Sequence, residues 1–327
     1  MDRDELRSLI EASDLNGLVR FIDRLVEAHD WDGLTSVRDR CVDAVERGKQ
    51  VWGAAQFAEY RMALDAPAPV AGAVIVPGAG RFALGPLWEV AASTHSWTEL
   101  EPYLSDPAPR AFAAHERVLR SDSDARSADI DGRIVEVPLQ LESWEPDYPV
   151  AVYRSDRADF PEREIPTLAW MELPEAAPDA VPDAATDALL ELVRPWIDDS
   201  SGRGEAVAVR GSALEAIRAL GPRRVRIGEV TLADALGVMV WTGASGGAYG
   251  KRRGTPAGRA GAWWAIAALL GMDDDWPPDG RELGAEAATL RWFVWDPGDR
   301  VGGWNFHLAV EDAEEGLAWA ASAVDWK

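Results

Sequence analysis

The spacing of apolar residues changes along the chain, and this change most limits the possible fold. In the first 65 residues, apolar side chains recur at the i, i+3, i+4 and i+7 intervals that place them on one side of a helix. After about residue 130 the apolar runs are short and alternating, and six prolines from Pro138 to Pro174 interrupt them. The sequence therefore predicts an α+β protein, with a helical N-terminal third followed by a mixed α/β domain with short antiparallel strands.

A short sequence repeats within the helical third. The segments 14–18 and 30–34 share the pattern Asp, apolar, Asn or Asp, Gly, Leu, sixteen residues apart. One helix and one turn fill this interval. The pattern resembles the helix-turn-helix units of tetratricopeptide and HEAT repeats, over about the first 120 residues and without the full consensus of either family. A plain helical bundle accounts for the same spacing, so both arrangements remain open.

Changes in composition predict where the chain divides. Polar, acid-rich residues after Leu119 are typical of a junction, and a run of Ala, Pro and Asp before a predicted helix is typical of a linker. The predicted segments are a helical repeat-like domain at 1–120, a short β-rich segment at 121–173, an Ala/Pro/Asp linker at 174–187 and a mixed α/β domain at 188–327.

Several elements can be placed within these segments. Alternating apolar residues predict a strand at 133–141, and a turn rich in Asp, Pro and Gly predicts a hairpin between strands at 290–295 and 304–310. The alanine-rich segment 312–324 predicts an amphipathic closing helix.

The net charge of the chain limits the classes of molecule that it can bind. The net charge is −23, from 33 basic and 56 acidic residues, which argues against general affinity for nucleic acid or for an anionic membrane and suits a basic protein partner. The distribution is uneven, because residues 201–260 hold ten basic and four acidic side chains. This local excess of positive charge is where we expect a small anionic ligand, if one binds.

Three observations predict a cytoplasmic protein. No apolar run reaches the roughly 18 residues of a membrane helix. The first residues are acidic where a signal peptide has a basic and then an apolar stretch. The single cysteine, Cys41, excludes an internal disulfide and a cysteine-based metal cage, which fits a reducing compartment.

A loop rich in glycine and arginine, at 243–259, is the strongest candidate site. It precedes a predicted helix, where free backbone N–H groups and the helix dipole favour an anion, and arginine forks pair well with phosphate or carboxylate. The alternative is structural, with the arginines paired to carboxylates of the same chain. The candidate ligand-binding residues are Lys251, Arg252, Arg253, Arg259, Gly246 and Gly250.

Two catalytic motifs fit the same loop only in part. Residues 243–247 match the G-x-S-x-G turn of α/β-hydrolases, with His307 later in the chain, but helical spacing precedes them where that turn needs a strand. A phosphate-binding P-loop would need glycine at Ser245 and a hydroxyl at Arg252. Catalytic residues therefore remain unknown, and whether the chain is an enzyme stays open.

Metal ions and cofactors are not expected. The four histidines are scattered, and none forms H-x-x-x-H or H-E-x-x-H. The acidic turns at 273–275 and 296–299 lack the spacing of a calcium-binding loop and are better explained as solvated turns.

Tryptophans on the predicted C-terminal strands have two explanations. Trp292, Trp295 and Trp304 alternate with other apolar residues, so at least one aromatic side chain per strand can face away from the core. Exposed tryptophans mark binding surfaces, and core filling is the alternative.

The residues of the Gly/Arg-rich segment and of the C-terminus also carry a resemblance. The segments 245–254, 258–259, 262–265, 308–312 and 316–319 resemble an uncharacterised protein family of high-GC actinobacteria. Such a family has no established activity, so the resemblance directs attention to the loop and implies no function.

These observations favour binding over catalysis. We expect a scaffold or regulatory protein that engages another protein chain, such as a basic toxin or nuclease that it inhibits. The alternative is an enzyme or sensor that binds a small phosphorylated or nucleotide-like anion at the loop, with Ser245, Tyr249 or His307 nearby. The two differ in whether the loop arginines meet carboxylates of the same chain.

Overall fold

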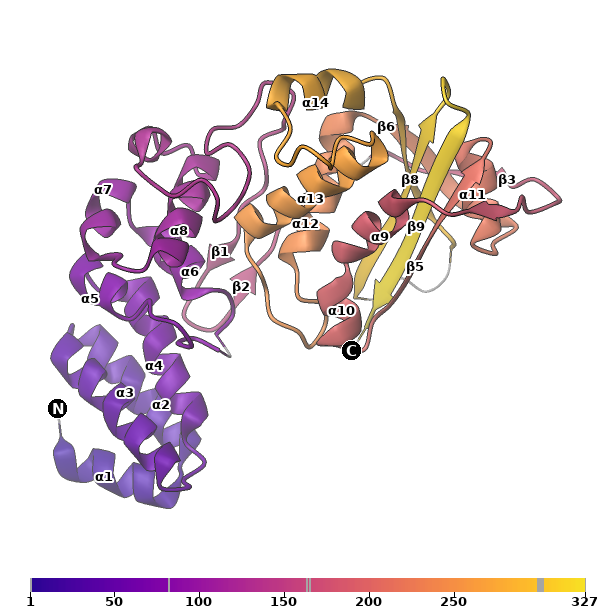
Figure 1. Cartoon of the computed structure of the whole chain (residues 1–327). Coiled ribbons are helices and arrows are strands. Elements are labelled where there is room, and N and C mark those ends of the chain that lie inside the picture. The colour runs from indigo at the N-terminus through magenta and orange to yellow at the C-terminus, as the bar shows by residue number, and fades with distance from the viewer. Residues whose placement is uncertain (1, 82, 163, 165, 299–302, 327) are drawn as a thin grey trace. The chain divides into compact units, whose positions relative to one another are not determined.

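A computed structural model describes residues 2–81, 83–162, 164, 166–298 and 303–326 (Figure 1). The chain divides into two compact units. Met1–Ile134 with Ala151–Phe160 form the helical unit, and Val135–Val150 with Pro161–Lys327 form the sheet unit. The predicted α+β class with a helical N-terminal third is therefore confirmed.

Short helices make up most of the helical unit. In chain order they are α1 Arg3–Ala12, α2 Leu15–Glu27, α3 Trp31–Glu46, α4 Trp52–Asp65, α5 Ala68–Ala73, α6 Leu87–Thr94, α7 Trp97–Leu100 and α8 Pro107–Leu119, with 3-10 turns at Glu101–Tyr103 and Asp124–Ser127. Two short antiparallel strands, β1 Val152–Tyr153 and β2 Ala158–Asp159, complete the unit.

The repeated Asp-x-x-Gly-Leu sequence is a repeated helix start. Asp14 and Asp30 are the N-caps of α2 and α3, and each carboxylate accepts a hydrogen bond at 2.9 Å from the backbone N–H of the glycine three residues on. A Cβ at Gly17 would lie 2.5 Å from the Asp14 carboxylate, so a larger residue there would displace the capping side chain. Capping accounts for the repeat, and the resemblance to tetratricopeptide or HEAT repeats stays a prediction.

Buried polar contacts attach the segment 151–160 to the helices. The Tyr153 hydroxyl donates to Glu89 of α6 at 2.7 Å, and Arg120, the residue after α8, donates to the Ala151 carbonyl at 2.6 Å. The Tyr60 hydroxyl donates to the Arg154 carbonyl. This segment therefore belongs to the helical unit although residues of the sheet unit precede it in the chain.

A seven-stranded sheet with the order β3-β6-β7-β8-β9-β5-β4 forms the centre of the sheet unit, and its neighbours are antiparallel. The strands are β3 Ala169–Glu172, β4 Ala180–Val181, β5 Arg203–Arg210, β6 Arg224–Val230, β7 Arg291–Asp296, β8 Trp304–Asp312 and β9 Leu317–Asp325. The predicted hairpin is confirmed as the neighbours β7 and β8, and part of its turn, 299–302, lies outside the described residues.

Helices cover the sheet on two sides (Figure 1). Helix α11, Ala213–Ala219, packs on a core that includes Ala318 and Ala320 of β9 and Phe293 of β7. Side chains alternate along a strand, so Trp319 faces the other side, where the remaining helices lie. These helices are α9 Ala184–Glu191, α10 Arg194–Asp198, α12 Leu232–Ala244, α13 Thr255–Leu269 and α14 Gly280–Ala287.

The predicted closing helix at 312–324 is wrong, because this segment is a turn followed by β9, between β8 and β5. The Asp312 carboxylate accepts the N–H groups of Glu314 and Glu315, and Gly316 has a φ of 64°, which turns the chain back. The predicted strand at 133–141 is also wrong, since the structure shows turns and irregular backbone there. The segment 174–187, predicted as a linker, contains β4 and the start of α9.

Within the described residues, no helix combines the length and the apolar character needed to cross a membrane.

Candidate functional site

The Gly/Arg loop, residues 243–259, joins α12 to α13, and its non-helical part is 245–254. Asp325 at the end of β9 is fully buried and holds this part in place, accepting the Ala248 N–H at 2.6 Å and the Ser201 hydroxyl at 3.1 Å. The Tyr249 N–H donates to the Ser200 hydroxyl at 2.9 Å. Several backbone donors of the loop are thus used internally, and fewer remain for an anion than the sequence suggests.

Two of the predicted ligand-binding glycines are required by the loop's own backbone. A Cβ on Gly246 would lie 2.1 Å from the Lys251 carbonyl oxygen, and one on Gly250 would lie 2.0 Å from the Gly246 oxygen. No side chain fits at either position without moving the backbone. Gly246 and Gly250 therefore let the loop fold on itself.

Arg259, the arginine on α13, is turned inward. It is 1% exposed, and its Nε and Nη2 atoms donate to the fully buried Glu145 carboxylate at 2.7 and 2.6 Å. It also donates to the carbonyls of Pro138 and Gln140, at 2.5 and 3.1 Å. For Arg259, therefore, the structural explanation is correct, in which an arginine pairs with a carboxylate of the same chain. The guanidinium joins segment 135–150 to α13, and a ligand cannot reach it from solvent.

The Glu145 carboxylate is ionised because of this pair. Burial by itself would raise its pKa, but the hydrogen bonds and the charge of Arg259 outweigh that effect and lower the pKa. The Trp263 indole, the Tyr148 hydroxyl and the Glu142 backbone N–H also donate to this carboxylate, at 3.2, 2.9 and 3.0 Å. Sequence reasoning missed Glu145, which stands 114 positions before Arg259 in the chain with no pattern linking the two.

The other three basic residues of the loop point to different surroundings. Arg252 donates to the Thr255 hydroxyl at 3.1 Å. Lys251 is exposed, and Arg253 is exposed and lines a pocket. Among the residues that the structure describes, neither Lys251 nor Arg253 forms an ion pair. These two cations are available to an external group.

The pocket beside Arg253, here called the loop pocket, has a volume of about 250 Å³. Small residues of α12 and α13 form part of its wall, and charged and aromatic residues form the rest. Its lining residues are Glu136, Glu191, Leu192, Gly243, Arg253, Ala260, Gly261, Trp264 and Trp276.

The loop pocket combines one cation, two carboxylates and two aromatic rings. Trp264 and Trp276 pack edge to face, with ring centroids 5.1 Å apart, and the Trp276 Nε1 donates to Glu136 at 3.0 Å. Glu191 forms an exposed ion pair with Arg194 at 2.5 Å. The negative charge near the rings suits a cationic group, and Arg253 suits an anionic one. Sequence analysis found Arg253 and missed Glu136 and Trp276, which come from distant segments.

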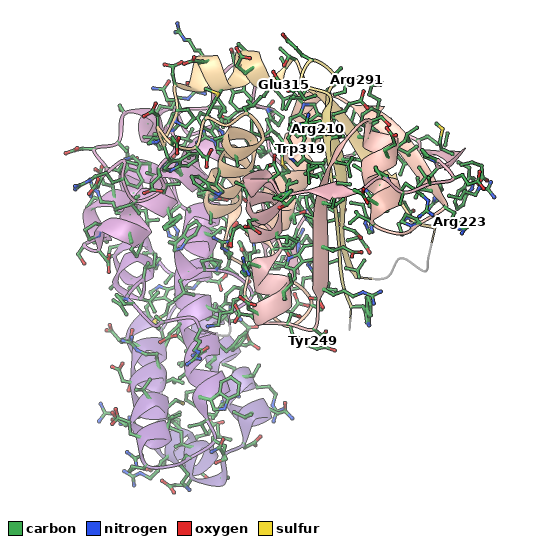
Figure 2. The ribbon with its side chains drawn as sticks, turned by 45° about the vertical axis from the view of Figure 1, so that its right-hand side comes forward. Arg210, Arg223, Tyr249, Arg291, Glu315 and Trp319 are labelled. Carbon is green, nitrogen blue, oxygen red and sulfur yellow. The ribbon has the colours of Figure 1, made fainter. Side chains whose placement is uncertain are left out.

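None of the three residues expected near an anion, Ser245, Tyr249 and His307, lines the loop pocket. Ser245 is buried at the end of α12, where its hydroxyl accepts the Gly247 N–H at 3.1 Å, and the element before it is a helix, as the sequence indicated. Tyr249 is 63% exposed and lies at the surface (Figure 2). His307 lies on β8 against Trp295, with ring centroids 4.6 Å apart, and lines a different pocket. Across the described part of the chain, no group of three or more His, Cys, Asp or Glu side chains is placed to hold a metal ion.

One comparison with known proteins gives a match. A protein-family model with the description "Family of unknown function (DUF6183)" matches residues 16–315, which confirms the expectation of an uncharacterised family. No curated protein and no solved structure matches the chain.

Proposed function

The chain belongs to DUF6183, a family of unknown function, and we propose that it is a binding protein whose loop pocket takes a small ligand carrying both a negative and a positive charge. The observation behind this proposal is Arg253, which lines a pocket, has no ion-pair partner among the described residues, and shares that pocket with two carboxylates and two tryptophans.

Each end of such a ligand has a counterpart in the loop pocket. A guanidinium fork pairs with a carboxylate or a phosphate, and Arg253 supplies that fork. Tryptophan faces attract a cation, above all a quaternary ammonium group, and Glu136, which is held by Trp276, adds a negative charge beside them. A zwitterion of amino-acid size therefore satisfies both.

A purely anionic ligand, which the sequence suggested, has less support in this pocket. Glu136 would repel a second negative group, and Arg259 is committed to Glu145. Binding of a phosphorylated or nucleotide-like anion is the alternative result that the experiment below can give.

We expect a zwitterion such as glycine betaine, phosphocholine or a free amino acid to bind, and Arg253→Ala to weaken that binding by at least about tenfold, the effect of losing a hydrogen bond to a charged group. Isothermal titration calorimetry gives the affinity, and the thermal unfolding midpoint shows whether the ligand stabilises the protein. Lys251→Ala is the matched control, because Lys251 carries the same charge in the same loop but does not line the pocket.

Two results would count against the proposal. Equal weakening by Lys251→Ala would mean that general positive charge on the loop, and not the pocket, attracts the ligand. Equal binding of inorganic phosphate and of the zwitterion would favour the anion.

The helical unit supports a second candidate, the binding of a basic protein chain. Helix α3 exposes Val42 and Val45 near the acidic Asp43 and Glu46, a surface that complements a chain with apolar and basic side chains. A basic partner bound at low salt should be lost from a Val42→Ser, Val45→Ser double variant. Surface plasmon resonance measures this binding. If the partner binds the double variant as well as the wild type, α3 is not the binding surface.

A further inference from the structure

Neighbouring strands of the central sheet separate at one place. The β7–β8 ladder runs from Arg291 paired with Glu311 to Val294 paired with Leu308 and stops there. Yet β7 stays paired with β6 as far as Asp296, and β8 stays paired with β9 from Trp304 onward. The ends of the two strands are thus held in the sheet by their other neighbours but not by each other.

A second pocket, here called the sheet pocket, opens at this separation, with a volume of about 220 Å³. Val294, Trp295 and Asp296 line it from β7, and Asn305 and His307 line it from β8, while α12 and the segment before β3 supply the rest. The remaining lining residues are Glu162, Leu168, Gly237, Val238 and Trp241.

Charge in the sheet pocket argues against an ionic ligand. No Lys or Arg stands among the described lining residues, so an anion has no countercharge. Asp296 is already paired with Arg226 and also accepts the Gly298 N–H at 2.7 Å. Desolvation raises the pKa of Glu162, which weakens the pull on a cation.

Hydrogen-bonding groups in the sheet pocket include both acceptors and donors. The Asp296 and Glu162 carboxyl groups accept, and the Asn305 amide donates. Trp295 is 3% exposed, and its Nε1–H has no acceptor among the described residues. A buried indole N–H normally has a partner, and this one is closed to solvent, so a ligand acceptor reaches it only after a small shift of the surrounding side chains.

We propose that the sheet pocket binds the ring of an uncharged sugar. Hydroxyl groups donate to the carboxylates and accept from the indole and amide N–H groups, and the apolar face of a sugar ring packs against tryptophan. The sheet pocket and the loop pocket share no lining residue, so each proposal can be tested without the other.

The experiment uses the full chain and a panel of monosaccharides, including glucose, galactose, mannose and N-acetylglucosamine, with choline chloride and sodium phosphate as charged probes. Saturation-transfer NMR detects binding, and calorimetry measures the affinity of any sugar that binds. We expect at least one sugar to bind and neither charged probe to compete with it.

Variants locate the sugar. Val238→Phe places a ring in the pocket and should abolish binding, whereas Trp295→Phe keeps the ring packing, removes the Nε1–H and should weaken binding about three- to tenfold. Arg253→Ala, in the loop pocket, should leave sugar binding unchanged. If Val238→Phe fails to fold, the sugar affinity of Trp295→Phe alone tests whether the sugar lies in the sheet pocket.

The proposal is overturned by any of three results. The first is that no sugar of the panel binds the wild-type protein. The second is that sugar affinity falls with Arg253→Ala but not with Trp295→Phe, which would place the sugar elsewhere. The third is that choline displaces the sugar, which would make the pocket a cation site.

Discussion

Replacing Arg259 by alanine should destabilise the sheet unit by about 3–5 kcal/mol, because it leaves the Glu145 carboxylate buried without its countercharge. The two carbonyls that Arg259 serves, those of Pro138 and Gln140, lose a donor at the same time. Denaturant unfolding followed by tryptophan fluorescence suits this measurement, since twelve of the sixteen tryptophans belong to the sheet unit.

A double variant separates the charge from the packing. Arg259→Met with Glu145→Leu removes both charges and keeps apolar volume, so it should recover a large part of the lost stability. Recovery should be incomplete, because the carbonyls of Pro138 and Gln140 still lack their donor. A double variant as unstable as Arg259→Ala would show that the ion pair is not what holds segment 135–150 to α13.

Low pH should weaken the ion pair between Arg259 and Glu145, because it protonates the Glu145 carboxylate. Glu145 has a lowered pKa in the folded protein, so its stabilising contribution is fully present above its ordinary value of 4.5 and is lost as the pH falls through the folded value. The sheet unit of the wild-type protein should therefore lose stability below about pH 4.5 more steeply than that of the double variant.

The second large effect is expected at Gly258 on α13. Glycine to alanine within a helix usually stabilises by about 0.5–1 kcal/mol. At Gly258, however, a Cβ would lie 2.1 Å from the Val240 carbonyl oxygen and 2.7 Å from the Ala244 nitrogen, both backbone atoms of α12. Gly258→Ala should therefore push the two helices apart and destabilise the sheet unit by about 1–3 kcal/mol.

Gly261, three residues further along α13, provides the matched control. A Cβ there would meet only the Leu192 Cδ2 atom, at 3.2 Å, the end of a flexible side chain. We expect Gly261→Ala to be within about 0.5 kcal/mol of wild type. If both variants lose the same stability under the same denaturant assay, close packing of α12 against α13 is not the cause.

Some elements of the fold have clear local signals in the sequence. The capping boxes, formed by Ser212 with Glu215 and by Thr231 with Asp234, mark the starts of α11 and α12 in the structure. The prediction of a helix at 312–324 is wrong because the four alanines of 317–325 favour a helix. The position of this segment between β8 and β5 requires a strand instead. Small side chains fit there because helices cover both faces of the sheet, a tertiary condition that no local pattern carries.

Only part of the candidate site was visible in the sequence. The cluster of arginines identified the loop, but sequence could not tell Arg253, which lines a pocket, from Arg259, which is buried against Glu145. Glu145, which binds Arg259, and Glu136, which lines the loop pocket with Arg253, both lie more than 100 positions earlier in the chain. Trp295 was recognised as either core or binding surface, and it is buried while also lining the sheet pocket.

The order of the two units along the chain has a consequence for synthesis. The helical unit is incomplete until residue 160 has been made, since 151–160 belong to it, whereas 135–150 are made earlier but belong to the sheet unit. Glu145 therefore leaves the ribosome long before Arg259, and its carboxylate must stay hydrated until α13 follows. Because this contact joins residues far apart in the chain, it should form late in folding, after the helical unit is complete.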